Sequence, residues 1–181
     1  MPPTEAESLE RAIHEEVALS PWDARWPAQF EAERARLMSL FPAQLIDVQH
    51  FGSTAIPGMT AKPVIDILAG VESMAVADAL AGPLLRSHYT TSAGFNATLT
   101  NRRWFMRWAD GRRTHHLHVV VYGSDEWQRR LRFRDALRAD GSLAARYGAL
   151  KNDLAVLHRV DREAYTDAKT AFVASVLGAA G

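Results

Sequence analysis

The chain has 181 residues, 48% of them hydrophobic, so it has enough apolar material for one globular domain around one core. Its 21 basic and 21 acidic residues leave no net charge, which argues against nucleic-acid binding through an overall positive field. Cysteine is absent from the sequence, which excludes disulfides, thiolate metal ligands and a cysteine nucleophile.

The first half of the chain mixes helix and strand signals. The N-terminus is polar and no run of 18 apolar residues occurs, so we expect a cytoplasmic protein with no signal peptide and no membrane partner. Periodicity and turn residues predict, in chain order, a loose or helical arm at 1–16, a helix at 26–41, a strand at 45–51, a buried strand at 64–71, and a helix that Ser73 caps and that runs through Leu84.

The second half predicts a hairpin followed by helices. Residues 88–101 predict no definite element, whereas 103–108 and 114–122 predict two strands joined at Asp110-Gly111. Three helices follow, with expected N-caps at Ser124, Ser142 and Asp161 and a stop at Gly178. The order predicts an α/β (α+β) fold with one mixed sheet, flanking helices and a C-terminal helical layer, all in one domain over residues 17–181.

The turn Gly52-Ser53-Thr54 is the sharpest candidate for a ligand site. Glycine lets a backbone approach a ligand closely, and N–H groups that follow it can form an anion-binding nest. The Ser53 and Thr54 hydroxyls add hydrogen-bond donors at the end of a strand. We therefore predict that this turn binds phosphate.

Asp66 stands alone in an otherwise apolar strand thirteen residues after Ser53. An ionised carboxylate is unfavourable there unless a partner meets it. One interpretation is a divalent metal between Asp66 and a phosphate, with Mg²⁺ or Mn²⁺ as first choices. The other is a structural ion pair with an arginine or with Lys62. We predict a functional pocket in which Asp66 and Lys62 are the catalytic candidates.

Two histidines of the segment THHLHVVVY share one face of their predicted strand. His116 and His118 are two residues apart, so both could ligate one metal, including a transition metal, or contact one phosphate. The alternative is a hydrogen-bonded pair facing a polar crevice. If this strand lies beside the Asp66 strand, the three side chains form a candidate metal site.

The basic residues are unevenly distributed. Ten arginines and only four acidic residues lie between positions 102 and 138, where Arg134 and Arg138 share one helix face and are candidates for an anion pocket. The chain has 18 arginines and three lysines, Lys62, Lys151 and Lys169. A lysine in such a chain either marks a place for a compact ammonium or survives by chance. We include Lys62, Lys151 and Arg134 among the phosphate-binding candidates.

Two tyrosine–lysine pairs, Tyr147/Lys151 and Tyr165/Lys169, occur four residues apart in the predicted C-terminal helices. Each pair places a ring and an ammonium on one helix face. Either the pairs contribute to a site, or the rings are core and the lysine stems cover them.

The segment GSTAIPGMTAKPVIDI resembles the signature of the GrpB-like, UPF0157 family. The likeness covers about residues 17–177 and continues through LSPWDARWPAQFEAE, HHLHVV, EWQRRLRFRDALR, RYGALKNDLA and YTDAKTAFV. It implies a nucleotidyltransferase fold like the polymerase-β palm. It also implies kinship with actinobacterial proteins in which this domain is fused to dephospho-coenzyme A kinase.

The same resemblance shows a departure from the superfamily pattern. Nucleotidyltransferases usually carry two carboxylates two residues apart on the second strand, but Asp66 has Val64 and Leu68 at these positions. We expect a nucleotide- or phosphometabolite-binding protein, and the resemblance implies nucleotidyl transfer to a small acceptor as its candidate activity, against which the missing carboxylate pair argues. The alternatives are a non-catalytic accessory module and a metal-dependent phosphohydrolase.

Overall fold

The structure is a computed structural model that describes residues 3–14, 18–158 and 161–179. The ends of the predicted arm, residues 1–2 and 15–16, lie outside this range. The elements in chain order are α1 (Glu5–His14), α2 (Trp26–Leu40), β1 (Asp47–Phe51), the 3₁₀ turn η1 (Ser53–Ala55), β2 (Ile65–Val71), α3 (Met74–Ala79), α4 (Ala81–Leu85), β3 (Tyr89–Thr90), α5 (Ala93–Ala97), β4 (Arg102–Ala109), β5 (Arg112–Val121), α6 (Asp125–Ala139), α7 (Gly141–Leu157) and α8 (Arg162–Ala179).

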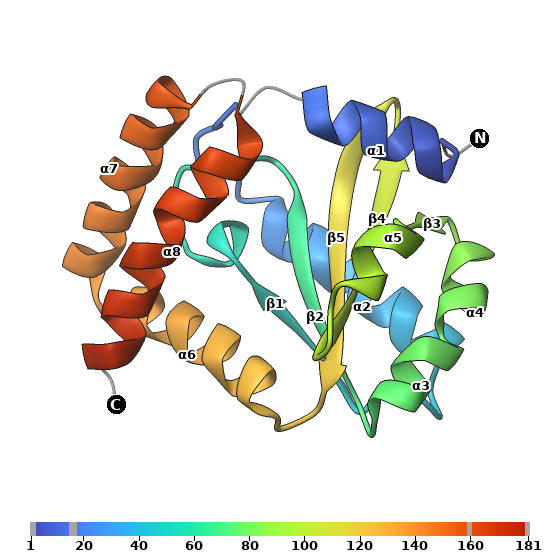
Figure 1. Cartoon of the computed structure of the whole chain (residues 1–181). Coiled ribbons are helices and arrows are strands. Elements are labelled where there is room, and N and C mark those ends of the chain that lie inside the picture. Colours follow the sequence, from blue (N-terminus) through green and yellow to red (C-terminus); the bar gives the residue numbers. More distant parts are fainter. Residues whose placement is uncertain (1–2, 15–17, 159–160, 180–181) are drawn as a thin grey trace.

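Five strands form one mixed sheet in the order β1-β2-β5-β4-β3. Strands β2 and β5 are parallel, and the other neighbours are antiparallel. Figure 1 shows α2 behind this sheet, and α6, α7 and α8 gathered beside its β1 edge. The predicted α/β fold with flanking helices and a C-terminal helical layer is confirmed.

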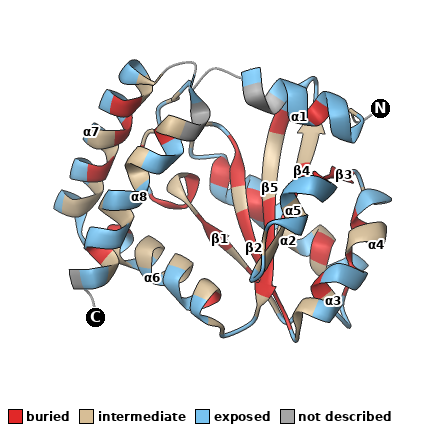
Figure 2. Ribbon diagram, viewed as in Figure 1, coloured by how far each residue is buried: buried red, intermediate tan, exposed pale blue. Residues whose placement is uncertain are grey.

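One face of the sheet forms the main core. Alternate residues such as Ile67, Leu117 and Phe105 pack there against α2, where Leu37 is fully buried. Figure 2 shows the buried strand residues in red between helices whose outer sides are exposed. This packing leaves the intervening residues of each strand for the opposite face, which is only partly covered.

The opposite face, which we call the Asp66 face, carries Phe51, Asp66, His116 and His118. The pairing places Asp66 opposite Phe51 on one side and opposite His116 on the other. Helix α6 covers part of this face through Trp127, which packs on Phe51, Leu68 and Val120. The β4 side is covered by Phe95 of α5, which packs edge-on against Trp104, and by Ser8 of α1, which contacts Met106.

Local capping explains most helix starts. The Ser73 and Ser124 side chains accept hydrogen bonds from the Val76 and Trp127 N–H groups, as predicted. The predicted cap Asp161 accepts from the Ala164 N–H at 2.9 Å. The predicted Ser142 cap is wrong. Asp140 caps α7 instead, because its carboxylate accepts from both the Ser142 and the Leu143 N–H groups and suits the positive end of the helix.

Other elements differ from the prediction for identifiable reasons. The helix expected from Ser73 through Leu84 divides into α3 and α4, since Pro83 has no N–H to donate to the preceding turn. The indefinite segment 88–101 contains β3 and α5. Helix α8 continues through Gly178, the predicted stop.

The predicted hairpin is present. Asp110 and Gly111 both have positive φ, 52° and 72°, as a tight hairpin turn requires. The predicted arm contains α1, which docks on the sheet, where Trp108 Nε1 donates to the Ser8 hydroxyl at 2.9 Å. None of the helices in the described part of the chain could cross a membrane.

Candidate functional site

Gly52 brings the turn backbone directly onto the Asp66 carboxylate. Its φ of 72° and ψ of −173° are a conformation that almost only glycine adopts. A Cβ at this position would lie 2.4 Å from Asp66 Oδ2, which is closer than any real Cβ contact. Glycine is therefore required twice, by the backbone angles and by the carboxylate packed against it.

Backbone N–H groups that the sequence predicted to bind an anion form hydrogen bonds within the turn instead. The Ala55 and Ile56 N–H groups donate to the Gly52 and Ser53 carbonyls at 3.1 Å, so both N–H groups are used within the turn. The Thr54 hydroxyl is buried and pairs with His50 Nε2 at 2.8 Å. Thr54 therefore faces the core. Ser53 is the hydroxyl of this turn that reaches the helical layer, where its side chain hydrogen-bonds with Tyr147.

His116 lies beside Asp66, as strand parity predicted. The two residues pair directly across β2 and β5, with His116 Nδ1 3.5 Å from Asp66 Oδ1. Their side chains are 14% and 28% exposed, so the carboxylate stays accessible. Arg113 Nη1 lies 3.1 Å from His116 Nε2. A guanidinium can only donate, so Nε2 accepts and Nδ1 carries the proton that faces Asp66. His116 therefore positions Asp66.

His118 lies on the same face, one pleat farther along β5, opposite Leu68. It is buried, and its Nδ1 accepts from Arg102 Nη1 at 2.9 Å. Burial lowers the pKa of His118 well below its usual range, and the nearby Arg130 and Arg102 act in the same direction. The imidazole is therefore neutral, with its proton on Nε2.

The predicted metal site at Asp66, His116 and His118 is not assembled. Metal ligation needs an imidazole lone pair, but Arg113 occupies that of His116 and Arg102 that of His118. Within residues 3–14, 18–158 and 161–179, no group of three or more histidine, aspartate or glutamate side chains is arranged to hold a metal ion. The donor set does not fit a metal bound by the protein alone.

The three lysines come from three parts of the chain and gather beside the Tyr147 and Tyr165 rings; we call them the lysine cluster. Lys62 Nζ and Lys169 Nζ lie 4.5 Å and 4.7 Å from the centre of the same Tyr165 ring. Lys151 Nζ lies 5.4 Å from the Tyr147 ring centre and donates to the Thr60 carbonyl at 2.5 Å. Cation–π contacts of this kind hold the ammonium groups in place.

Lys151 and Lys169 are cations in an unfavourable environment. Lys151 is only 2% exposed, and its burial, reinforced by Lys169, lowers its pKa to about 7, although Asp66 acts in the opposite direction. Burial likewise lowers the pKa of Lys169, again against Asp66. No carboxylate in the described part of the chain forms an ion pair with either lysine. A bound anion would relieve this arrangement.

Arg134 and Arg138, the predicted anion-pocket arginines, instead hold the turn against α6. Arg134 donates to the Gln49 side chain and the His50 carbonyl at 2.8 Å and 3.0 Å, and pairs with Asp135. Arg138 donates to the Ala55 carbonyl at 2.9 Å. These contacts tie α6 to β1 and to the turn.

The comparison with known proteins decides the family. A sequence model described as GrpB protein matches residues 16–179. The glutamate-rich protein GrpB of Alkalihalophilus pseudofirmus is 35% identical over 167 residues, which are 90% of this chain and 94% of that protein. The chain belongs to the GrpB family. A crystal structure of GrpB from Enterococcus faecalis superposes with a TM-score of 0.78 at 32% identity, covering 88% of this chain and 94% of that one. This match is consistent with the nucleotidyltransferase-like fold.

Some GrpB-family relatives are parts of larger proteins. A dephospho-CoA kinase of Mycolicibacterium paratuberculosis is 34% identical over 175 residues, which cover 84% of this chain but 43% of the kinase. The likeness is therefore to a portion of that protein.

The candidate site includes residues that the sequence did not single out as binding candidates. Lys169 belongs to the lysine cluster and Tyr147 lies beside it, and the four-residue tyrosine–lysine spacing was the signal for both. Arg102 and Arg130 also approach the Asp66 face. Nothing in the sequence separated them from the other arginines of the basic block.

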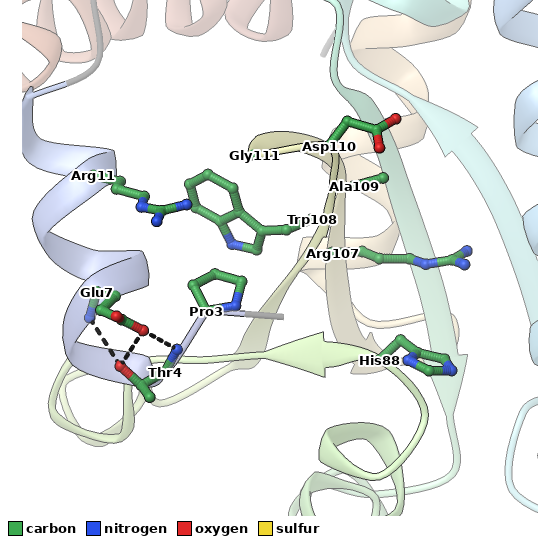
Figure 3. A pocket seen from close by; sticks show the side chains of 10 residues that line it. All are labelled: Pro3, Thr4, Glu7, Arg11, His88, Arg107, Trp108, Ala109, Asp110 and Gly111. Atoms are coloured by element: carbon green, nitrogen blue, oxygen red, sulfur yellow. Dashed lines mark hydrogen bonds between the residues drawn. The ribbon is translucent and has the colours of Figure 1, made fainter. Parts of the chain in front are cut away.

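Two hollows of this GrpB-family chain lie away from the site. One, of about 560 Å³, lies between α1 and the β4–β5 hairpin, where Figure 3 shows Arg11 beside Trp108 and Glu7 bonded to Thr4. Another, of about 400 Å³, is lined by residues of α3, α4 and α5, including Asp78 and Asn96. The candidate site on the Asp66 face is identified by its chemistry.

Proposed function

We propose that this protein binds a phosphate-bearing small molecule, a nucleotide or a phosphorylated metabolite, on the Asp66 face beside the lysine cluster. The observation that carries the proposal is the convergence of all three lysines of an arginine-rich chain beside two tyrosine rings, of which Tyr147 hydrogen-bonds with Ser53 of the turn. A compact ammonium suits a phosphate oxygen, and burial strengthens the interaction by removing competing water.

Each part of the site has a role in this proposal. Lys151, Lys169 and Lys62 neutralise the phosphate charge, and the Ser53 hydroxyl donates to one of its oxygens after releasing Tyr147. Asp66 repels a bare phosphate, so it accepts a hydrogen bond from a hydroxyl of the ligand. His116 fixes the carboxylate orientation for this contact.

Nucleotidyl transfer and phosphohydrolysis are weaker proposals than binding. The positions two residues from Asp66 are the apolar Val64 and Leu68, and Leu68 is fully buried. Two-metal phosphoryl transfer needs several oxygen ligands, which this face does not supply. A divalent cation therefore enters the proposal only as a counter-ion that the ligand's own phosphates carry.

A titration panel tests the binding proposal. ATP, CTP, tripolyphosphate, inorganic phosphate, dephospho-CoA and CoA are each titrated into the protein by isothermal calorimetry, with and without Mg²⁺ or Mn²⁺. The two coenzymes are included because the related kinase is named for one of them. We expect binding of at least one phosphorylated compound without added metal, and Ser53→Ala should weaken it about tenfold. Heat signals no larger than those of buffer dilution for every compound would reject the proposal.

The catalytic alternative is separated by turnover. Release of pyrophosphate or phosphate is followed for each compound that binds, beside the Asp66→Asn variant, which removes the charge but keeps the shape. We expect equal background rates in the two proteins. Metal-dependent turnover that Asp66→Asn abolishes would instead establish an enzyme.

A further inference from the structure

A second group of basic side chains lies on the Asp66 face, around the Phe51 ring. It consists of Arg102 at the start of β4, His118 in β5 and Arg130 on α6. Besides burial, Arg130 and Arg102 lower the pKa of His118, and Arg130 lowers the pKa of Arg102. Sequence reasoning included both arginines only in a general basic block.

The surroundings of Arg102 favour the binding of an anion. Its guanidinium donates to the neutral His118 ring, and no carboxylate among the described residues pairs with it. Burial lowers the pKa of Arg102, and Arg130 acts in the same direction against Glu126. Its neighbour Arg103 points to the other face and pairs with Asp78 at 2.6 Å, the usual solution for an arginine on a strand.

Arg130 is only partly neutralised. Its Nε lies 2.9 Å from Glu126 Oε2, but the same carboxylate also contacts Arg129 at 3.7 Å. The Arg130 guanidinium lies over the Phe51 ring, with its Cζ 5.4 Å from the ring centre. Phe51 is the direct strand neighbour of Asp66, so Arg130 borders the candidate site.

His118 contributes a third donor to this group. Its Nδ1 accepts from Arg102, so Nε2 carries a proton. The group therefore combines two guanidinium ions and one N–H. The carboxylate beside it, Glu126, is shared between Arg130 and Arg129. Guanidinium groups bind carboxylate and phosphate oxygens through paired hydrogen bonds, so this donor set fits an oxyanion.

We propose that Arg102, His118 and Arg130 form a second anion subsite, which binds a carboxylate or phosphate group separate from the one at the lysine cluster. The inference deepens the proposed function and rests on it. The ligand, or a pair of ligands, then carries two anionic groups. A mononucleotide with one phosphate chain would fill only the lysine side.

Anomalous diffraction tests the subsite directly. Crystals of the protein are soaked in tungstate, a tetrahedral oxyanion, or in 4-bromobenzoate, a carboxylate with a strong scatterer. We expect two tungstate peaks in the wild type, one at the lysine cluster and one at Arg102. Arg102→Met should lose only the second peak, and the matched control Arg103→Met should keep both. A bromine peak near Arg102 without a second tungstate peak would assign the subsite to carboxylates.

The outcomes separate this inference from the proposed function. A tungstate peak at the lysines alone, with no bromine near Arg102, overturns the subsite and leaves the proposed function standing. Peaks at Arg102 alone keep the subsite and contradict the lysine site.

Solution titration guards against binding that occurs only at crystal concentration. The probe that gave the Arg102 peak is titrated into both proteins. The wild type should bind one more probe molecule than Arg102→Met, or bind the probe at least tenfold more tightly. Should Arg102→Met fail to fold, Arg130→Met is used in its place. Equal titrations of the wild-type and variant proteins would refute the proposal.

Discussion

Replacing Gly52 with alanine is expected to disrupt the turn and to abolish ligand binding. Alanine has to adopt a φ of 72° with ψ near 180°, a region that is essentially reserved for glycine. Its Cβ also has to lie where Asp66 Oδ2 is now, 2.4 Å away. We expect the free energy of unfolding, measured by urea denaturation, to fall by about 3 kcal/mol or more, combining strain of about 1–3 kcal/mol with overpacking.

Gly58 supplies the matched control for this prediction. It also has a positive φ, 79°, but nothing lies within 4 Å of a Cβ built there. Gly58→Ala therefore reports the strain of a positive φ without a clash, and Gly52→Ala should lose more stability because of the Asp66 contact and its extended ψ. Adding Asp66→Ala to Gly52→Ala should recover part of the lost stability. Equal losses in Gly52→Ala and Gly58→Ala would contradict the close packing of turn and carboxylate.

The second large effect is a loss of stability in mild acid. Burial is the main cause that lowers the pKa of His50 to about 4, of His115 to about 4 and of His118 well below its usual range. Between pH 6.5 and 4 the unfolded chain binds these protons and the folded chain does not, so stability rises with pH in this window and falls on acidification. Each histidine contributes about 1.4 kcal/mol per pH unit where only the unfolded state is protonated.

Urea denaturation at steps between pH 7 and 5 measures this slope, in a range where most carboxylates stay ionised. His115→Gln should lower the slope of stability against pH by about the contribution of one histidine. His14→Gln, which changes an exposed residue of α1, is the control variant. A stability that stays flat from pH 7 to 5 in the wild type would contradict neutral, buried histidines.

The sequence predicted the fold well because the relevant signals are local. The 3.6-residue spacing in α2, the apolar run in β2 and the Asp110-Gly111 turn each belong to one short segment. Strand parity also placed His116 on the face of Asp66, because residues two apart on a strand share a face. The Ser142 cap failed because a stronger competitor, Asp140, stands two residues earlier.

The site was predicted less completely because its contacts join distant segments. Sequence alone did not show that Arg113 and Arg102 occupy the lone pairs of the two histidines, and this occupation removes the expected metal site. Thr54 was assigned to phosphate because its hydroxyl follows Gly52. Its actual partner is His50 on the strand before the turn, and no spacing rule predicts this pair. Lys169 was left aside, since only the packing of α8 against α6 and α7 brings it to Asp66.

The most direct test of the central claim is the affinity of the lysine-cluster variants for tripolyphosphate and ATP, measured by calorimetry at pH 7. Lys151→Met and Lys169→Met each remove one ammonium, and Arg146→Met removes an exposed cation from the same helix as Lys151. Burial lowers the pKa of Lys151 to about 7, which means that its charge is unfavourable in the folded protein. Replacing it with methionine should therefore leave the fold intact. A charge-assisted contact contributes about 1.5–3 kcal/mol, so each lysine variant should bind about 10- to 100-fold more weakly, with Arg146→Met unchanged. Folded lysine variants that bind as tightly as the wild type would contradict a phosphate site at this turn.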